Sequence, residues 1–585
     1  MKLHAPRIET RRAEGCADLH RSRPHSTSAR QSACTKGLAH SLQLHREPSL
    51  PIARMSMNPR TFMLAAPLVC STLLAAAVSA AVPQQDPGPT TRWEVDSASE
   101  AWLGTSVALG DHGATLIAAK ELNTPGVAIY STASPQPIYQ LDLPDTWQVR
   151  VDAARKAQTL AAMVVHENPN AIGPKLWAEL KVWREAKHAL PDWVYRFPLT
   201  TYYMSKGMNV HISDDGQVIA AWFTDLDRNV VHLKVFNPAG DILLDHEITR
   251  PFNAVLADDG DLSDDGSRLL IDISNNPALI DLTTGDEILN LTHHSMFGGL
   301  ALSGDGRRMA LGGEPFAEVW EENATGQWSL LKRMDFSGER IAGAMELDTD
   351  GSHLAMTVMD YTDWFQVRVR DLNADREVYR HKFEAPGNNS NLWPSRICLT
   401  DDAQLVAGSS WGDSFDTTPT GFVFDANGAL SNTLRTTGSG LAFDMDPSGQ
   451  VMAMSTKRTH VNEFGSGGEI ICADTRQPEL SIAGFPESAG KVVMTIRGAA
   501  THARVVAALE LGSSSTAWGP SQLDLSSAIT NSGFQTIPAT GMQRQLTLPS
   551  TPALLGRALH MQAELVDRSI QIGYLSNRVS IRILP

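Results

Sequence analysis

The sequence is poor in cysteine. Only 5 of its 585 residues are cysteine, and three of these precede residue 80. The other two, Cys398 and Cys472, each lie inside a short apolar segment, so we expect buried thiols, with a disulfide between them as the alternative. No histidine or cysteine shows the spacing of a zinc site, and the His293-His294 pair has no partner at such a spacing. The sequence therefore predicts no disulfide framework and no metal centre.

Basic residues are also scarce. The chain holds 49 Lys and Arg against 65 Asp and Glu. Residues 1–80 carry 11 basic and 4 acidic residues, so the remainder carries 38 basic and 61 acidic ones. A chain this acidic repels nucleic acid and anionic membranes. We therefore expect no nucleic-acid partner.

Motifs of catalysis and cofactor binding are missing as well. The chain has no Gly-x-Ser-x-Gly nucleophile elbow and no glycine-rich phosphate-binding fingerprint between a strand and a helix. The acidic run 258–266 is not an EF-hand loop, because Leu269 stands where the loop needs a glutamate. We assign these aspartates to turn formation. The sequence thus predicts no catalytic residue, no cofactor and no bound metal.

Only one long apolar run is present, and it lies near the start of the chain. It covers residues 61–77, follows Arg60 and ends at the small-residue site Val78-Ser79-Ala80, which is typical of a secretory signal peptide. We expect a signal peptide over 55–80, a non-native or disordered extension over 1–54 and a linker over 81–91. An uncleaved membrane anchor is the alternative. After cleavage we expect no stable membrane span and an exported protein in the periplasm, the cell envelope or the medium.

What the sequence does contain is a repeat. Ser213–Gly216, Ser263–Gly266 and Ser303–Gly306 each place an Asp-Gly turn between two apolar segments. Asp and Gly tolerate the backbone angles of a tight hairpin. Further copies, some degenerate, centre near residues 113, 155, 351, 403 and 449. Successive copies lie 40 to 61 residues apart, close to the ~40–50 residues of a propeller blade.

A second hairpin follows each turn. One example joins His232–Phe236 to Asp241–Leu244 through Asn237–Gly240. Short apolar segments bounded by Gly, Pro, Asn and Thr indicate strands, so two hairpins per repeat make a four-stranded blade. Eight copies predict an all-β fold, an eight-bladed β-propeller over 92–485, with seven blades as the alternative. We expect residues 92–95 to add the outer strand of the last blade.

The repeat resembles those of WD40-like β-propellers of bacteria. The resemblance rests on the Ser-x-Asp-Gly turns and on third strands that end in Val182-Trp183 and Val319-Trp320. The Gly-His dipeptide of strict WD40 repeats is absent, which points to the looser relatives. The resemblance implies a repeat protein that binds its partner through surface loops.

The last hundred residues lack the repeat. Lys491–Ile496 and Ala503–Leu509 are expected to pair, and three more strands are expected over 543–548, 558–566 and 579–584. This pattern predicts a small β-sandwich over 486–585. Its segments 548–549, 552–556, 560–563 and 575–577 resemble a C-terminal module of secreted bacterial repeat proteins, which implies display at the cell surface or in the envelope rather than chemistry.

Two sets of loops on one face of the predicted propeller are rich in aromatic and polar residues. Exposed Trp and Tyr beside Asp suit a carbohydrate or protein partner. The alternative is that these aromatic side chains fill space between blades. The candidate ligand-binding residues are Tyr202, Tyr203, Asp360, Tyr361, Asp363, Trp364, Trp393, Trp411 and Asp413.

Two hypotheses of function follow, with a structural stalk that binds no ligand as a further alternative. The first is a non-catalytic binding scaffold that holds its partner on the loop face. The second is a propeller enzyme of lactonase or lyase type that acts at the central channel. Acids or histidines clustered at the axis with raised pKa values would favour the enzyme, whereas a broad aromatic face without them would favour the scaffold.

Overall fold

The computed structural model describes residues 90–584 apart from short gaps. The gaps are 98–101, 122–124, 168–175, 188, 198–206, 250–256, 275, 292–298, 337–339, 361–362, 386–391, 414–417, 437, 462–466, 476–479, 484–489, 497–501, 517–518, 532–534, 537–541, 549–550 and 568–571. The expected extension and signal peptide, and nearly all of the expected linker, lie outside the described residues.

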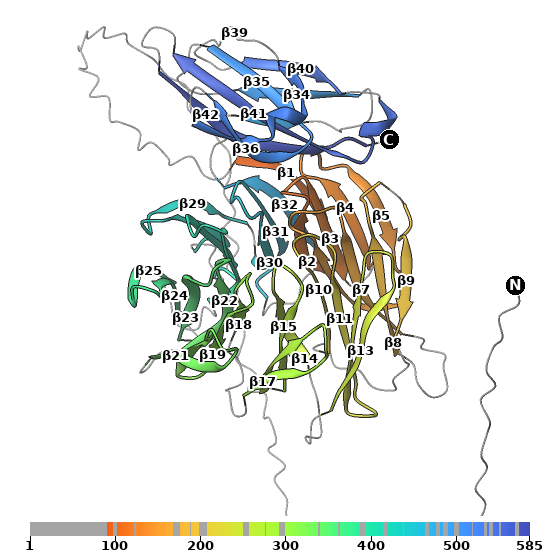
Figure 1. The fold of residues 1–585 in the computed structure, drawn as a ribbon, viewed down its shortest axis with the longest axis vertical. Coiled ribbons are helices and arrows are strands. Elements are labelled where there is room, and N and C mark those ends of the chain that lie inside the picture. Colours follow the sequence, from red (N-terminus) through yellow and green to blue (C-terminus); the bar gives the residue numbers. More distant parts are fainter. Residues whose placement is uncertain are drawn as a thin grey trace, which may run out of the picture. The chain divides into compact units, whose positions relative to one another are not determined.

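The described chain is almost entirely β-structure, as predicted (Figure 1). Eight four-stranded antiparallel sheets hold its strands up to residue 474. The first four sheets are β2 (Trp102–Gly110), β3 (Thr115–Glu121), β4 (Gly126–Ser131) and β5 (Pro137–Asp142); β6 (Thr146–Ala153), β7 (Leu160–Glu167), β8 (Leu176–Trp183) and β9 (Trp193–Arg196); β10 (Met208–Ile212), β11 (Ile219–Asp225), β12 (Val230–Phe236) and β13 (Ile242–Thr249); and β14 (Ala257–Leu262), β15 (Arg268–Ile273), β16 (Asn276–Asp281) and β17 (Glu287–Asn290).

The second four sheets continue in the same order along the chain. They are β18 (Leu300–Leu302), β19 (Arg308–Gly312), β20 (Phe316–Glu322) and β21 (Trp328–Asp335); β22 (Arg340–Leu347), β23 (His353–Met359), β24 (Trp364–Asp371) and β25 (Arg376–Glu384); β26 (Pro394–Leu399), β27 (Leu405–Ser410), β28 (Gly421–Asp425) and β29 (Leu430–Leu434); and β30 (Ser439–Met445), β31 (Val451–Lys457), β32 (Gly468–Asp474) and β1 (Thr90–Ser97).

The eighth sheet joins the two ends of the repeat region. Strand β1 pairs antiparallel with β32, which confirms the prediction that residues near 92 add an outer strand to the last repeat. The Arg92 guanidinium binds the Asp474 carboxylate at 2.6 Å. The Trp93 indole donates to the carbonyl oxygen of Thr132, which directly follows β4 of the first sheet, at 3.0 Å. The first described strand is thereby tied to both the eighth sheet and the first.

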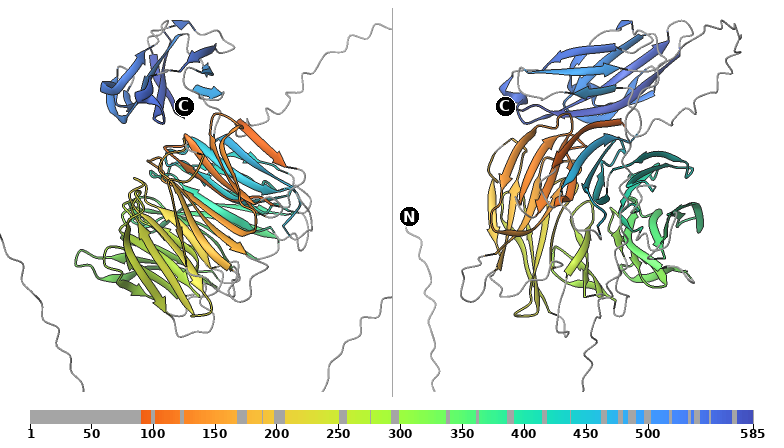
Figure 2. Two further views of the ribbon diagram at one scale, coloured as in Figure 1. Left: turned by 90° about the vertical axis from the view of Figure 1, so that its right-hand side faces the viewer. Right: turned by 180° about the vertical axis from the view of Figure 1, so that it is seen from behind.

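Neighbouring sheets pack face to face, and the core lies between them. Met163 of β7, for example, shares a buried cluster with Ile219 and Phe223 of β11. Strands β11 and β12 are buried along their whole length, whereas the outer strand β13 is largely exposed. Continuous apolar segments therefore form the inner strands, because both of their faces are covered. The first strands also contact one another in sequence from β2 to β30, and β30 contacts β2 (Figures 1 and 2).

The repeated Ser-Asp-Asp-Gly motif forms the turn between the first two strands, as predicted. The Ser213 hydroxyl donates to Asp215 Oδ1 at 2.7 Å, and that oxygen also accepts the Gln217 N–H at 2.9 Å. Gly266 of the next copy has a φ of 70°. An added Cβ there would lie 2.4 Å from the Cβ of Val218 in the neighbouring sheet, so both the turn and the packing require glycine. The second aspartate of the motif thus shapes the turn and leaves the first free for another role.

The C-terminal strands pair differently from our expectation. Their elements are β33 (Leu480–Ala483), β34 (Lys491–Ile496), β35 (His502–Ala508), β36 (Leu511–Thr516), β37 (Gly519–Leu523), β38 (Ala528–Asn531), β39 (Gln535–Thr536), β40 (Met542–Thr547), β41 (Ala558–Asp567), β42 (Ile572–Arg582) and two 3-10 turns, Leu525–Ser527 and Pro552–Leu554. Strands β34 and β35, expected to pair, lie in different sheets: β34 pairs with β33 and β40, and β35 with β38, β39 and β41. A shared apolar cluster connects the two sheets, because each strand covers the other's sheet instead of extending it. Strand β33 precedes the expected boundary at residue 485 but pairs with β34.

Replacing Trp93 by alanine tests how much β1 contributes to stability. Trp93 is 5% exposed and packs on Tyr130 with ring centroids 5.1 Å apart. We expect the variant to lose about 3–5 kcal/mol of unfolding free energy in urea titrations, because removing a buried indole leaves a cavity and takes one hydrogen bond from the Thr132 carbonyl. Glu94→Ala on the exposed face of the same strand is the control and should change stability by less than about 0.5 kcal/mol. Equal effects of the two substitutions would contradict the assignment.

Candidate functional site

The candidate ligand-binding residues that the structure describes fall into two groups. Tyr202, Tyr203 and Tyr361 lie outside the described residues. In the first group, Asp360 Oδ1 accepts the N–H groups of Asp363 at 2.9 Å and Trp364 at 3.2 Å, so Asp360 shapes the turn before β24. The Lys382 ammonium lies 4.9 Å from the centre of the Trp364 ring.

The second group lies at the start and end of the hairpin β26–β27. The rings of Trp393 and Trp411 stack with centroids 5.2 Å apart and an interplanar angle of 24°. Asp413 is 1% exposed and accepts the N–H and hydroxyl of Thr418, so it stabilises its own loop. Of these three residues, Trp393 also lines a cavity. Its role in binding a ligand stays a prediction.

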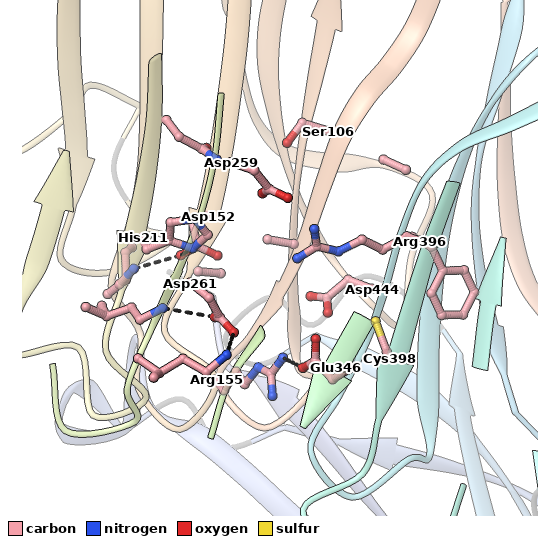
Figure 3. Close-up of a pocket in the computed structure, with 18 of the residues that line it drawn as sticks. Ser106, Asp152, Arg155, His211, Asp259, Asp261, Glu346, Arg396, Cys398 and Asp444 are labelled. Atoms are coloured by element: carbon pink, nitrogen blue, oxygen red, sulfur yellow. Dashed lines mark hydrogen bonds and ion pairs between the residues drawn. The ribbon is translucent and has the colours of Figure 1, made fainter. Parts of the chain in front are cut away.

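This cavity, the central cavity, has a volume of about 790 Å³. The first strand of every one of the eight sheets contributes lining residues, from Ser106 of β2 to Asp444 of β30. Figure 3 labels several of these residues. Since those strands contact one another in sequence, the cavity lies where the eight sheets meet. Its size is that of a small-molecule site.

The cavity wall contains one equivalent position in each first strand. Each of these eight ring positions pairs with the residue nine places later in the second strand. In sheet order they are Ala108, Asp152, His211, Asp261, Ala301, Glu346, Cys398 and Asp444. All but Ala301 line the cavity. Every second sheet therefore supplies a carboxylate, and the sheets between supply Ala, His, Ala and Cys.

Three of the four ring acids also hold neighbouring sheets together. Asp152 accepts the N–H of Ile212 at 2.7 Å, and Asp261 accepts the N–H of Leu302 at the same distance. Asp444 accepts the N–H of Leu109 at 2.6 Å. Each bond joins a first strand to the first strand of the next sheet. These acids thus have a structural role, which leaves their remaining lone pairs for a ligand.

Glu346 differs from the other ring acids because it pairs with a cation. The Arg155 guanidinium lies 3.4 Å from its carboxylate. Arg155 follows β6, in the second sheet, and Glu346 belongs to β22, in the sixth. These sheets are four places apart in a succession of eight, so Arg155 spans the cavity near the turns between first and second strands.

Burial changes the proton affinity of the ring. It raises the pKa of Asp152 to about 7, although the N–H groups of Ala153 and Ile212 oppose the change. The pKa values of Asp261 and Asp444 are raised by burial as well. Burial also lowers the pKa of His211 to about 3, so its imidazole is neutral at physiological pH. Removal from bulk water penalises the charged form in each case.

Asp152 and Asp261, whose pKa values are both raised to about 7, can therefore exchange protons near neutral pH. A carboxyl group that is part protonated at pH 7 can act as general acid in one form and general base in the other. The described residues contain no group of three or more His, Cys, Asp or Glu side chains placed to share a metal ion. Cys398 and Cys472 are both free and buried, as predicted, and Cys398 lies in the ring.

The ring acids were missed in the sequence because we assigned the run 258–266 to turn formation. Among its acids with described side chains, Asp265 has that role, through the Ser263 hydroxyl at 2.8 Å and the Ser267 N–H at 2.9 Å. Asp259, Asp261 and Asp264 line the cavity instead. A signal was present, since Asp261, Glu346 and Asp444 each lie five residues before the glycine of their turns. Aligning the repeats on that glycine would have revealed the acids.

Replacing Asp152 by asparagine tests the titration of the ring. A folded-state pKa of about 7 exceeds the unfolded value of 3.8, so the stability from the bound proton is full below pH 4 and lost as pH rises through 7. Asparagine still accepts the Ile212 N–H but does not titrate. Between pH 4 and pH 8 we expect the unfolding free energy to move in the variant's favour by up to about 4 kcal/mol.

Urea unfolding at pH 4, 6 and 8 measures this difference. Asp350→Asn is the matched control, because a hydrogen bond from the Ser352 side chain lowers the pKa of Asp350 and its titration lies outside this range. Parallel stability profiles of Asp152→Asn and the unmodified protein would contradict the assignment.

The site is interpreted from its geometry alone. The chain matches no protein-family model and no curated protein. Among the described residues, no helix is long and apolar enough to cross a bilayer.

Proposed function

We propose that the chain is an exported eight-bladed β-propeller, followed by a small β-sandwich, whose central cavity is its ligand site. Eight four-stranded sheets support eight blades over the seven-bladed alternative, as does the contact of β30 with β2. The pairing of β1 with β32 supports a ring closed by both ends of the repeat region. WD40-like propellers of bacteria remain the family that the repeats resemble.

The proposed ligand is a small polyhydroxylated molecule of the carbohydrate class. The observation that carries the proposal is the set of four acids, one from every second sheet, around one cavity of about 790 Å³. Carboxylates accept hydrogen bonds from hydroxyl groups, and the Trp393 ring offers an apolar surface in the same wall. The proposal moves the site from the loop face into the cavity.

Of the two hypotheses, the enzyme of lactonase or lyase type has the better support. Acids at the axis with raised pKa values are the feature that distinguishes it from a scaffold. In lactone hydrolysis, an ionised ring acid takes a proton from the attacking water. A protonated ring acid gives one to the leaving oxygen as the acyl C–O bond breaks. One observation still supports the scaffold hypothesis: the rings of Trp393 and Trp411 stack beside the cavity.

Turnover of a panel of sugar lactones by the full chain tests the proposal through the acid that hydrolysis releases. With a lactone that is hydrolysed, we expect Asp261→Asn and Glu346→Gln to lower the rate by about 10²-fold or more, because a general acid or base contributes that much. Trp364→Ala, which changes a candidate residue that does not line the cavity, is the control and should leave the rate unchanged.

Circular dichroism and urea unfolding would establish that each variant is folded. Loss of carbohydrate binding in Trp364→Ala, with binding retained in both ring variants, would favour the loop-face scaffold. No turnover and no carbohydrate binding in the unmodified protein would contradict the proposal.

A further inference from the structure

A second feature of the cavity bears on the class of ligand. Arg396 projects from β26 into the cavity, where its guanidinium and the carboxylates of Asp261 and Asp444 face the same space (Figure 3). Among the described residues, no hydrogen bond or ion pair engages this guanidinium. Other arginines of the interior are paired: Arg155 with Glu346, for example, and Arg92 with Asp474.

A guanidinium in such a place favours an anionic partner. Its planar set of five N–H donors matches a carboxylate, which it binds with two parallel hydrogen bonds. Asp259, Glu346 and Asp261 attract Arg396 through space. Donors that the protein leaves unmatched in a cavity are available to a ligand.

Charge decides which anion fits. The ring position in the strand of Arg396 is Cys398, two residues nearer the turn. The four ring acids occupy the equivalent position in four other first strands, where they repel negative charge. A carboxylate carries one charge, whereas a phosphate group carries up to two and meets more repulsion from the ring. A singly charged planar anion is therefore the better partner for Arg396.

The same strand region supplies an apolar surface. Trp393 lies three residues before Arg396 in the chain, lines the cavity and is held by stacking on Trp411. A ligand that places its anionic group on Arg396 can rest an apolar face against Trp393 and extend its hydroxyl groups to the ring acids. Arg396, Trp393 and the ring acids would thus each contact a different part of the same ligand.

We propose that the central cavity takes a sugar acid, or a comparable polyhydroxylated carboxylate, with the carboxylate bound by Arg396. This rests on the proposed function of the cavity and adds the anionic group that the ligand carries. In a lactonase the same arrangement would hold the hydroxy acid that ring opening produces.

Equilibrium binding of matched acid and neutral probes to the full chain tests this. The pairs are D-glucuronate with D-glucose, D-galacturonate with D-galactose, and D-gluconate with sorbitol, measured by calorimetry. We expect at least one acid to bind tenfold or more tightly than its neutral partner. Arg396→Gln should remove that preference and keep the neutral affinity, while Arg396→Lys should restore part of it.

The control is Arg376→Gln, which removes an arginine whose side chain is 70% exposed, and it should bind as the unmodified protein does. If neutral sugars bind as well as their acids, the inference about Arg396 is wrong and the proposed function stands. If Arg396→Gln keeps the preference for the acid, the carboxylate is bound elsewhere and the inference is again wrong. If no acid of the three pairs binds, the inference is overturned, and lactone turnover decides the proposed function separately.

Discussion

Carboxylates withdrawn from bulk water, where eight sheets meet, impose the constraint on which the rest of the structure depends. A buried charge is stable only with hydrogen bonds or opposite charge around it. Asp152, Asp261 and Asp444 meet this condition by accepting N–H groups from the next sheet, and Glu346 by pairing with Arg155. The same contacts join neighbouring first strands and hold the acids around one cavity. The carboxylate groups that join the sheets are thus the same groups that can gain or lose a proton.

The need to join neighbouring sheets does not by itself explain why acids occupy four of the ring positions. Ala108 and Ala301 occupy equivalent ring positions and accept no hydrogen bond through their side chains. Sheets therefore meet without a carboxylate at half of the ring positions. Packing apolar residues at the others would avoid the cost of burying charge. The acids are better explained by a ligand that uses them, and Arg396 by the anionic part of that ligand.

Much of the fold could be predicted from the sequence, because its signals are local. The Ser-Asp-Asp-Gly turns, the second hairpins and the pairing partner of residues near 92 all followed from short patterns with a physical reason. Pairing in the C-terminal region could not be predicted this way, since β34 and β35 are adjacent in sequence yet bury their apolar faces in separate sheets. The candidate site was harder to predict than the fold. Successive ring acids are separated by 85 to 109 residues along the chain, and only their common register brings them together. Of the aromatic candidates that the structure describes, Trp393 alone is placed in the cavity wall.

The protonation state of the ring is the central physical claim. Infrared titration of the carboxyl stretch, with Asp152→Asn and Asp261→Asn used to assign the bands by subtraction, measures it directly. We expect the Asp152 band to change with a midpoint near pH 7, and the Asp261 band to change above the ordinary aspartate range as well. Midpoints near 4 for both groups, as in exposed aspartates, would contradict it.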